Sequence, residues 1–396
     1  MTPEPGTGRR WAMLGASTLA QGAAAVSIHG APFLIPALRD SGLSLTQAGM
    51  VAAAPTLGVM LTLVAWGAVA DRRGERFTLL LGLAATALAG AVAMVVHHPV
   101  ALGAALFAAG ACAASTASAS GRVVVGWFPP ERRGLAMGIR QTAQPLGVGT
   151  AAISLAVVAE RYDVTAALGV PVLAAVVALT FVALVVVDPP RPRRGEAEAA
   201  NPYRGDDWLV RIHAVSVLLV VPQFLVWTFA LVWLVDERGW SAAAAGSLVA
   251  GMQVAGAVGR IAAGHVSDRV GSRMRPLRWI TVLATAVMLL LGGTAALDWP
   301  AAVALLVAAT VITVADNGLA FTAVAERAGP HWSGRALGIQ NTSQYLAASA
   351  VPPVAAWAVT QTSYPVTFAL AAAFPALAIA LVPQEIARAR RPVPAP

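Results

Sequence analysis

The chain contains no lysine, a single cysteine and few charged residues of any kind. All 27 basic side chains are arginine, and charged residues make up 12% of the 396 residues. Cys112 has no second cysteine to pair with, so an intramolecular disulfide and a thiolate metal site are both excluded. Because a soluble domain typically has about 25% charged residues, this composition is not that of a soluble domain.

Apolar residues dominate instead, at 58% of the chain, with a mean hydropathy of +0.70. The formal net charge of +8 is compatible with a nucleic-acid partner, but the arginines lie in short gaps between apolar runs. We therefore expect a lipid bilayer as the partner and no nucleic acid. Residues 1–10 are polar, and the apolar run after them is too long for a signal-peptide core, so we expect a retained first span.

Twelve segments are long enough to cross a bilayer as helices, which takes about 20 apolar residues. The expected spans are residues 11–36, 46–70, 77–97, 100–127, 134–159, 164–187, 209–235, 242–264, 277–297, 300–325, 334–358 and 365–383. The prolines of the polar segment between the sixth and seventh spans cannot continue a helix. The sequence thus predicts an all-α membrane protein with two six-helix bundles, residues 1–188 and 209–396, joined by a linker at 189–208.

The distribution of arginine predicts the orientation. With an even number of spans, both termini lie on one side, and most arginines outside the spans fall on that side, including Arg9 and Arg132. The opposite side has Arg39, Arg161 and Arg238 only. The positive-inside rule places the arginine-rich side in the cytoplasm. We expect a multi-pass protein of the cell inner (plasma) membrane with both termini cytoplasmic.

Two stretches of the chain recur about 200 residues apart. Residues 67–76 (GAVADRRGER) match 264–273 (GHVSDRVGSR) at six of ten positions, and 134–146 match 334–346 at seven of thirteen. The second span therefore corresponds to the eighth, and the fifth to the eleventh. Since six spans separate the equivalents, both halves insert with the same orientation and are related by an axis along the membrane normal.

Together, the twelve spans, the central linker and the repeated Gly-x-x-x-Asp-Arg-x-Gly-x-Arg loop resemble the major facilitator superfamily of transporters. The resemblance covers nearly the whole chain. It implies that the two loops control a gate on the cytoplasmic side. The loop residues are Gly67, Asp71, Arg72, Gly74 and Arg76 in the first copy and Gly264, Asp268, Arg269, Gly271 and Arg273 in the second.

The chemistry of the loop suits such a gate. Its first glycine lets neighbouring helices approach closely, and its aspartate suits a helix N-terminus, which has a partial positive charge. The resemblance implies that Asp71 meets the start of the eleventh span and Asp268 the start of the fifth. The following arginines can pair with Glu131 and Glu326, near the ends of the fourth and tenth spans. The alternative is a basic turn that only sets the topology.

Ionisable side chains inside spans are costly and indicate function by default. Arg140 shares a helix face with Gln144 one turn later, and the repeat places Gln340 and Gln344 in the same way. We expect these four to bind a polar or anionic solute; structural pairing within the protein is the alternative. The other candidates for this binding site are Gln21, Gln223, Trp227, Asn341 and Tyr345.

Three residues are candidates for proton coupling. Asp316 lies deepest in the apolar segments, where removal from water favours the neutral form of a carboxyl group; a static ion pair with Arg260 is equally compatible. His29 can titrate near neutral pH, or it can be a structural histidine. Arg122 and Arg260 lie about one turn from the cytoplasmic ends, so snorkelling to the interface is the alternative for both.

The leading hypothesis is a proton-coupled secondary transporter that moves a small solute by alternating access and works as a monomer. The chain has no Walker-type phosphate loop for ATP drive and no metal-ligand cluster or nucleophile–base constellation, so we expect no enzyme, no cofactor and no metal. A proton antiporter for drug or metabolite efflux is the alternative, because residues 144–149 partly match the Gly-Pro-rich motif of such antiporters. A non-transporting sensor is less favoured, since neither terminal segment is long enough to form a signalling domain.

Overall fold

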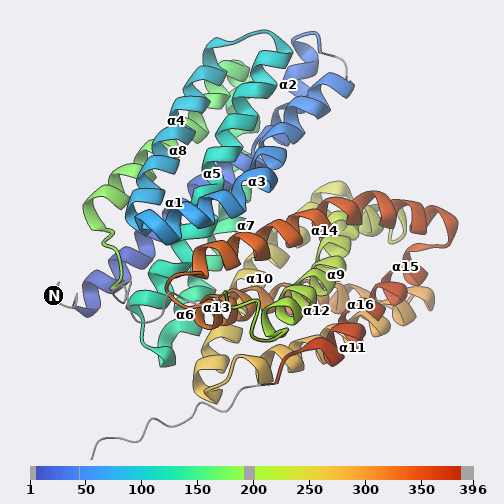
Figure 1. Ribbon diagram of the computed structural model, residues 1–396. Helices are drawn as coiled ribbons and strands as arrows, with labels where there is room; N and C mark the ends of the chain where they lie inside the picture. Colours follow the sequence, from blue (N-terminus) through green and yellow to red (C-terminus); the bar gives the residue numbers. More distant parts are fainter. Residues whose placement is uncertain (1–5, 44, 191–200, 385–396) are drawn as a thin grey trace, which may run out of the picture.

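The computed structural model describes residues 6–43, 45–190 and 201–384, which form helices and no strands. Figure 1 shows two helical bundles that follow one another along the chain. The first bundle contains α1 (Thr7–His29), η1 (Ala31–Leu34), α2 (Ile35–Asp40), α3 (Leu45–Arg73), α4 (Glu75–Val95), α5 (Pro99–Trp127), α6 (Pro130–Gln141), α7 (Ala143–Arg161) and α8 (Val164–Val185). The second contains α9 (Trp208–Asp236), α10 (Ala242–Val270), α11 (Met274–Ala296), α12 (Ala301–Val314), α13 (Asp316–Ala328), α14 (Ser333–Gln361), α15 (Tyr364–Ala371) and α16 (Ala373–Leu381).

The predicted all-α membrane fold is confirmed. Within the described residues, nine helical segments are long and apolar enough to cross a membrane, or ten if the bent pair Thr7–His29 and Ala31–Asp40 is one span. The two predicted spans outside this set, α10 and α14, are long helices with a lower apolar content. Each carries polar side chains that are buried against protein, such as Arg260 and Gln340. The exact domain boundaries stay predictions, and residues 191–200 of the expected linker lie outside the described residues.

Three of the predicted spans are interrupted near their middle. The fifth is divided at Thr142 into α6 and α7, the tenth at Ala315 into α12 and α13, and the twelfth at Ala372 into α15 and α16. In the fifth span, Pro145 has no N–H to donate to the carbonyl of Gln141 four residues earlier, so the helix cannot close its hydrogen bond there. Tyr345 occupies the equivalent position of the eleventh span, and α14 runs unbroken through it.

The two bundles touch on one side of the molecule and diverge on the other. Figure 1 shows them meeting around α6, α10 and α13 and separating toward α2 and α15. The largest buried apolar cluster contains residues of both bundles, such as Met137 and Leu337. Two further clusters each belong to one bundle, around Leu155 and Leu291 respectively. The largest shared core therefore lies near the ends that carry the repeated loops.

Candidate functional site

The first repeated loop joins α3 to the start of α14 in the opposite bundle. Asp71 Oδ1 accepts a hydrogen bond from the backbone N–H of Gly334 (2.8 Å), and Oδ2 accepts from the backbone N–H (3.1 Å) and Nε (2.8 Å) of Arg335. A methyl group on Gly67 would lie closer to Gly334 than van der Waals contact allows. Asp71 is 7% exposed, so this contact is sealed from water.

The second loop joins α10 to the second turn of α6 in the opposite bundle. Asp268 Oδ1 and Oδ2 accept from the backbone N–H groups of Gly134 (2.9 Å) and Leu135 (2.8 Å). Arg273 of the same loop donates to Asp268 Oδ1 (2.6 Å) and to the carbonyl of Pro130 in the opposite bundle (2.7 Å). We name these contacts the first latch (around Asp71) and the second latch (around Asp268).

The second glycine of each loop, Gly74 or Gly271, allows the backbone to turn after the helix. Gly74 has φ +101° and Gly271 has φ +66°, a region that residues with a Cβ atom rarely adopt. A side chain at Gly74 would also meet the carboxylate of Asp188. Arg72 and Arg269, the two loop arginines next to the latch aspartates, are exposed.

The expected pairing of the last loop arginines occurs in one copy only. Arg273 lies 3.5 Å from Glu326, which Arg133 approaches at 3.2 Å. In the first copy the structure contradicts the expected pairing with Glu131: Arg76 binds Asp188 through its backbone N–H (2.7 Å) and the carbonyl of Ala183 through its side chain. Because α5 ends at Trp127, Glu131 falls in the first turn of α6, where it is exposed.

Arg122 forms a third contact between the bundles. Its Nε lies 3.1 Å from Glu75 Oε1, a carboxylate that is fully buried, and its Nη1 donates to the carbonyl of Pro330, just before α14. At 4% exposure, Arg122 does not extend to the surface, so snorkelling does not describe it.

The end of the linker braces the first latch from the second bundle. The Tyr203 hydroxyl donates to Nε2 of His213 (2.9 Å), and the two rings stack at 5.9 Å. Tyr203 also packs edge-on against Trp332, whose ring lies 3.8 Å from the guanidinium of Arg335. Burial raises the pKa of the Tyr203 phenol to about 12, so the hydroxyl stays protonated and remains a donor.

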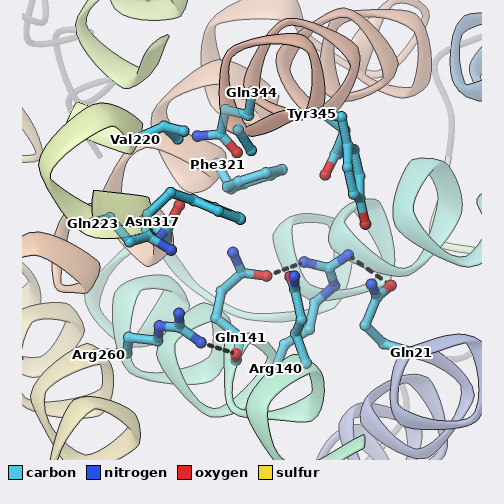
Figure 2. Close-up of a pocket in the computed structure, with 14 residues that line it drawn as sticks. Gln21, Arg140, Gln141, Val220, Gln223, Arg260, Asn317, Phe321, Gln344 and Tyr345 are labelled. Carbon is cyan, nitrogen blue, oxygen red and sulfur yellow. Dashed lines mark hydrogen bonds between the residues drawn. The ribbon is translucent and has the colours of Figure 1, made fainter. Parts of the chain in front are cut away.

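A polar pocket lies between the bundles above this sealed region (Figure 2). It holds about 560 Å³ of empty space, part of which is open to solvent. Both bundles contribute to its wall, which consists of Gln21, Arg140, Gln141, Gln144, Val220, Gln223, Phe224, Arg260, Asn317, Phe321, Asn341, Gln344, Tyr345 and Ala348.

Arg140 is the most buried charge of the pocket, with 1% of its surface exposed. Its guanidinium donates to the Ser120 hydroxyl (2.8 Å) and to the side-chain oxygens of Gln141 (2.7 Å) and Gln21 (3.4 Å), as Figure 2 shows for the two glutamines. Within the described chain it has no carboxylate partner. A buried guanidinium that is held only by neutral acceptors has the chemistry to bind an anion.

Arg260 reaches across the boundary between the two bundles, which we call the seam, to the break in the fifth span. Its Nη1 donates to the backbone carbonyl of Gln141 (2.8 Å), the same carbonyl that Pro145 leaves without a helical donor. Gln141 is therefore held through its side chain by Arg140 and through its backbone by Arg260 (Figure 2).

Asp316 is buried, at 2% exposure, and is not among the residues that line the pocket. It is the first residue of α13. Its charge interacts with that of Arg260, but Asp316 Oδ1 and Arg260 Nε have no hydrogen-bond partner in the described chain. The expected pair is thus close enough to interact electrostatically without a direct contact.

The structure brings seven of the nine predicted binding residues to the pocket and places the other two, Gln340 and Trp227, elsewhere. Gln340 is a correction: its side chain bonds to His213 and to Ser216 (2.5 Å) because this part of α14 packs on α9 where the bundles close. Trp227 also lies off the pocket, with its indole N–H on Gln253 (2.8 Å). The predicted residues that line the pocket are Arg140, Gln144, Gln344, Asn341, Tyr345, Gln21 and Gln223.

His29 lies beside the pocket and stacks on Tyr345, with ring centroids 6.3 Å apart. Sequence inspection missed Gln141, Asn317, Phe224 and Phe321 as wall residues. The repeat contained a signal for the first of these, because Gln141 is equivalent to Asn341 at the 200-residue offset. The two phenylalanines had no such signal, because an aromatic side chain in a span usually packs between helices.

Comparison with known proteins agrees with this architecture. A sequence model described as the Major Facilitator Superfamily matches residues 18–352 and 223–396. Two proteins of Mycobacterium tuberculosis, from strains H37Rv and CDC 1551, are 47% and 46% identical over 394 residues. Both are described as uncharacterized MFS-type transporters, and the match covers 98% of this chain and 88% of each relative.

Solved structures share the fold at low sequence identity. The transporter FucP in its outward conformation has a TM-score of 0.76 at 14% identity, over 93% of this chain and 97% of that one. The proton:xylose symporter XylE has a TM-score of 0.75 at 16% identity, over 94% and 95%. At these identities the likeness concerns the fold alone.

Proposed function

The chain belongs to the major facilitator superfamily of transporters, and we propose that it moves a small polar or anionic solute by alternating access. The observation that supports this most directly is the pocket between the bundles, which two latches close on the arginine-rich side. Its wall contains Arg140, which is buried and has no carboxylate partner among the described residues. A solute that binds there contacts both bundles, so its binding can favour their movement against one another.

We further propose that transport is coupled to protons through Asp316 and Arg260. When Asp316 is ionised, Arg260 is drawn toward it; when Asp316 is protonated, Arg260 is free to hold the carbonyl of Gln141 across the seam. His29, stacked on Tyr345 at the pocket, is the second candidate proton carrier. The driving force is then a proton gradient across the plasma membrane, with the arginine-rich side and both termini in the cytoplasm and the monomer as the working unit.

A thiol-labelling experiment tests alternating access without knowledge of the solute. In a Cys112→Ala background, Ala348→Cys places one thiol on the pocket wall. A membrane-impermeant maleimide is expected to label it from the side opposite the arginine-rich ends, and from the arginine-rich side when the latches are broken. Labelling from one side under every condition, including both latch aspartates mutated, would argue against alternation.

Flux into proteoliposomes tests the coupling. Asp316→Asn is expected to keep counterflow of labelled solute, which needs only alternation of the loaded carrier, and to lose accumulation driven by a proton gradient. Accumulation that is unchanged in Asp316→Asn, or flux in the wild type that ignores the gradient, would contradict proton coupling at this residue. No observation on the described residues favours drug efflux or sensing.

A further inference from the structure

The pocket wall has an unusual composition for a general binding site. Two of its residues are arginines, seven are carboxamides (Gln21, Gln141, Gln144, Gln223, Asn317, Asn341 and Gln344) and one is the phenol Tyr345; no carboxylate lies among the described lining residues. A cationic solute would be repelled by two guanidinium groups. A hydrocarbon would leave the amides without hydrogen-bond partners, which is costly in a closed site.

The groups around Arg140 have the geometry of a carboxylate site filled by substitutes. Its Nη1 and Nη2 donate to the carboxamide oxygens of Gln141 and Gln21, at 2.7 and 3.4 Å. A carboxylate binds the same two nitrogens in the bidentate arrangement that a guanidinium favours. Rotation of each amide by half a turn then presents its NH₂ group to the bound anion, because a carboxamide carries a donor and an acceptor on one carbon.

The rest of the wall can bind hydroxyl groups. Gln344 Nε2 is buried without a partner in the described chain, and Gln144, Asn341 and Tyr345 line the same space. Amide and phenol groups both donate and accept, as does a hydroxyl. The second cation is not free for another anion, because Arg260 is held by the Gln141 carbonyl and lies in the field of Asp316.

We propose that the substrate is a small hydroxylated monocarboxylate, with its carboxylate on Arg140 and its hydroxyls on the surrounding carboxamides. This rests on the transport function proposed above and gives that function its chemical class. Arg140 gains the counter-ion that the described residues do not supply, and the amides gain partners that neither a simple fatty acid nor a neutral hydrocarbon offers.

A matched ligand series tests the class on the purified full-length protein, with the ligand-dependent shift in unfolding temperature as the readout. Gluconate, glucose, glucarate and propionate differ in the number of carboxylates or hydroxyls. Gluconate is expected to raise the unfolding temperature most. An equal shift with glucose would overturn the carboxylate; an equal shift with propionate would overturn the hydroxyls; a larger shift with glucarate would overturn the single charge; and no shift with gluconate would overturn the class.

Two variants test the assignment to Arg140. Arg140→Lys keeps the charge but loses the two donor nitrogens of the planar guanidinium. It is expected to weaken gluconate binding about 10- to 100-fold. Gln21→Glu places a permanent carboxylate beside Arg140 and is expected to raise the unfolding temperature of the ligand-free protein while abolishing the gluconate shift. Because this second variant gains stability, loss of binding in it cannot come from misfolding. Unchanged gluconate affinity in Gln21→Glu would overturn the proposal.

The matched control is Arg39→Gln, which removes an exposed arginine of α2 far from the pocket and should leave the gluconate shift unchanged. The Ala348→Cys labelling needs no solute, so it separates the two proposals. If labelling alternates and the ligand series fails, only the substrate class is wrong. If labelling never alternates, the transport function itself fails.

Discussion

The two latches have the same backbone contacts and different ion pairs. In each, an aspartate accepts two backbone N–H groups of a helix in the opposite bundle, from the first turn of α14 in one latch and the second turn of α6 in the other. The side-chain donor to Asp71 is Arg335, which comes from the opposite bundle; the side-chain donor to Asp268 is Arg273, which comes from the same loop. The repeated aspartates thus set the capping, and their non-equivalent neighbours set the charge pairing.

This difference determines what breaks when the bundles separate. Opening the first latch breaks the ion pair of Asp71 with Arg335, because the two residues belong to opposite bundles. Opening the second leaves Asp268 paired with Arg273 and breaks the bonds of Arg273 with Pro130 and of Arg133 with Glu326 instead. The first latch thus has the ion pair of its aspartate across the two bundles, whereas the second keeps that pair within one loop and contacts the opposite bundle through several partly exposed groups, each of which contributes less.

The close backbone contact that the latches share is expected to give the largest effect. Gly67→Ala and Gly264→Ala both place a methyl group against the backbone of the opposite glycine, where it cannot rotate away. Overpacking costs about 1–3 kcal/mol, so each variant should increase labelling of Ala348→Cys from the arginine-rich side roughly 10- to 100-fold. Gly149→Ala, which meets no atom within 4 Å, is the control. Labelling no faster than in this control would contradict a tight seam.

The aspartates themselves test the asymmetry. Asp71→Asn removes a charge from a pair that crosses the seam, and a hydrogen bond to a charged group contributes about 1.5–3 kcal/mol. Asp268→Asn leaves Arg273 with Glu326 and the Pro130 carbonyl. We expect Asp71→Asn to speed labelling from the arginine-rich side about tenfold or more, and Asp268→Asn to speed it less. The double variant Asp71→Asn with Arg335→Gln should add little to Asp71→Asn alone; equal effects of the two aspartates would refute the comparison.

Sequence alone predicted the parts of this architecture that depend on repetition and hydropathy. The spans, the duplicated loops and the contact of each aspartate with the first residues of the predicted eleventh or fifth span follow from patterns that survive in both halves. The partner of Arg76 did not follow, because it depends on local placement: Glu326 ends α13, but the position equivalent to it at the 200-residue offset is Gly126. Glu131 is the first acid that follows the predicted fourth span along the chain, but it lies in α6 and not at the end of α5.

The pocket shows the same limit. Arg140 and Gln144 were identified because polar groups inside spans are rare, whereas Gln340 satisfied the same criterion and lies outside the pocket. What separates them is the depth of the seam: α14 packs against α9 at Gln340 and faces the pocket one turn later at Gln344. Helical spacing predicts which side chains share a face, but where that face leaves a packed interface depends on the neighbouring bundle.

A smaller effect is expected at the helix break that only the first half contains. Pro145→Ala supplies the N–H that can bond to the Gln141 carbonyl and so competes with Arg260 for it. Loss of part of one such bond is worth about 0.5–1.5 kcal/mol, so labelling from the arginine-rich side should rise only about threefold. Pro171→Ala, within α8 and away from the seam, is the control. Hydrogen exchange should show the new amide at residue 145 protected; an unprotected amide would mean that the break has another cause.

The smallest effect is expected at the brace of the first latch, which has no counterpart at the second. Tyr203→Phe removes the hydroxyl bond to His213 but keeps the ring against Trp332, so the loss should be about 0.5–1.5 kcal/mol. Since burial raises the pKa of Tyr203 to about 12 from its ordinary value of about 10, folding favours the protonated phenol. The stability difference between wild type and Tyr203→Phe should therefore be constant below about pH 10 and shrink between about pH 10 and 12. Thermal unfolding of both proteins across this range measures it, and a difference that already falls between pH 7 and 9 would show that another group titrates in this contact.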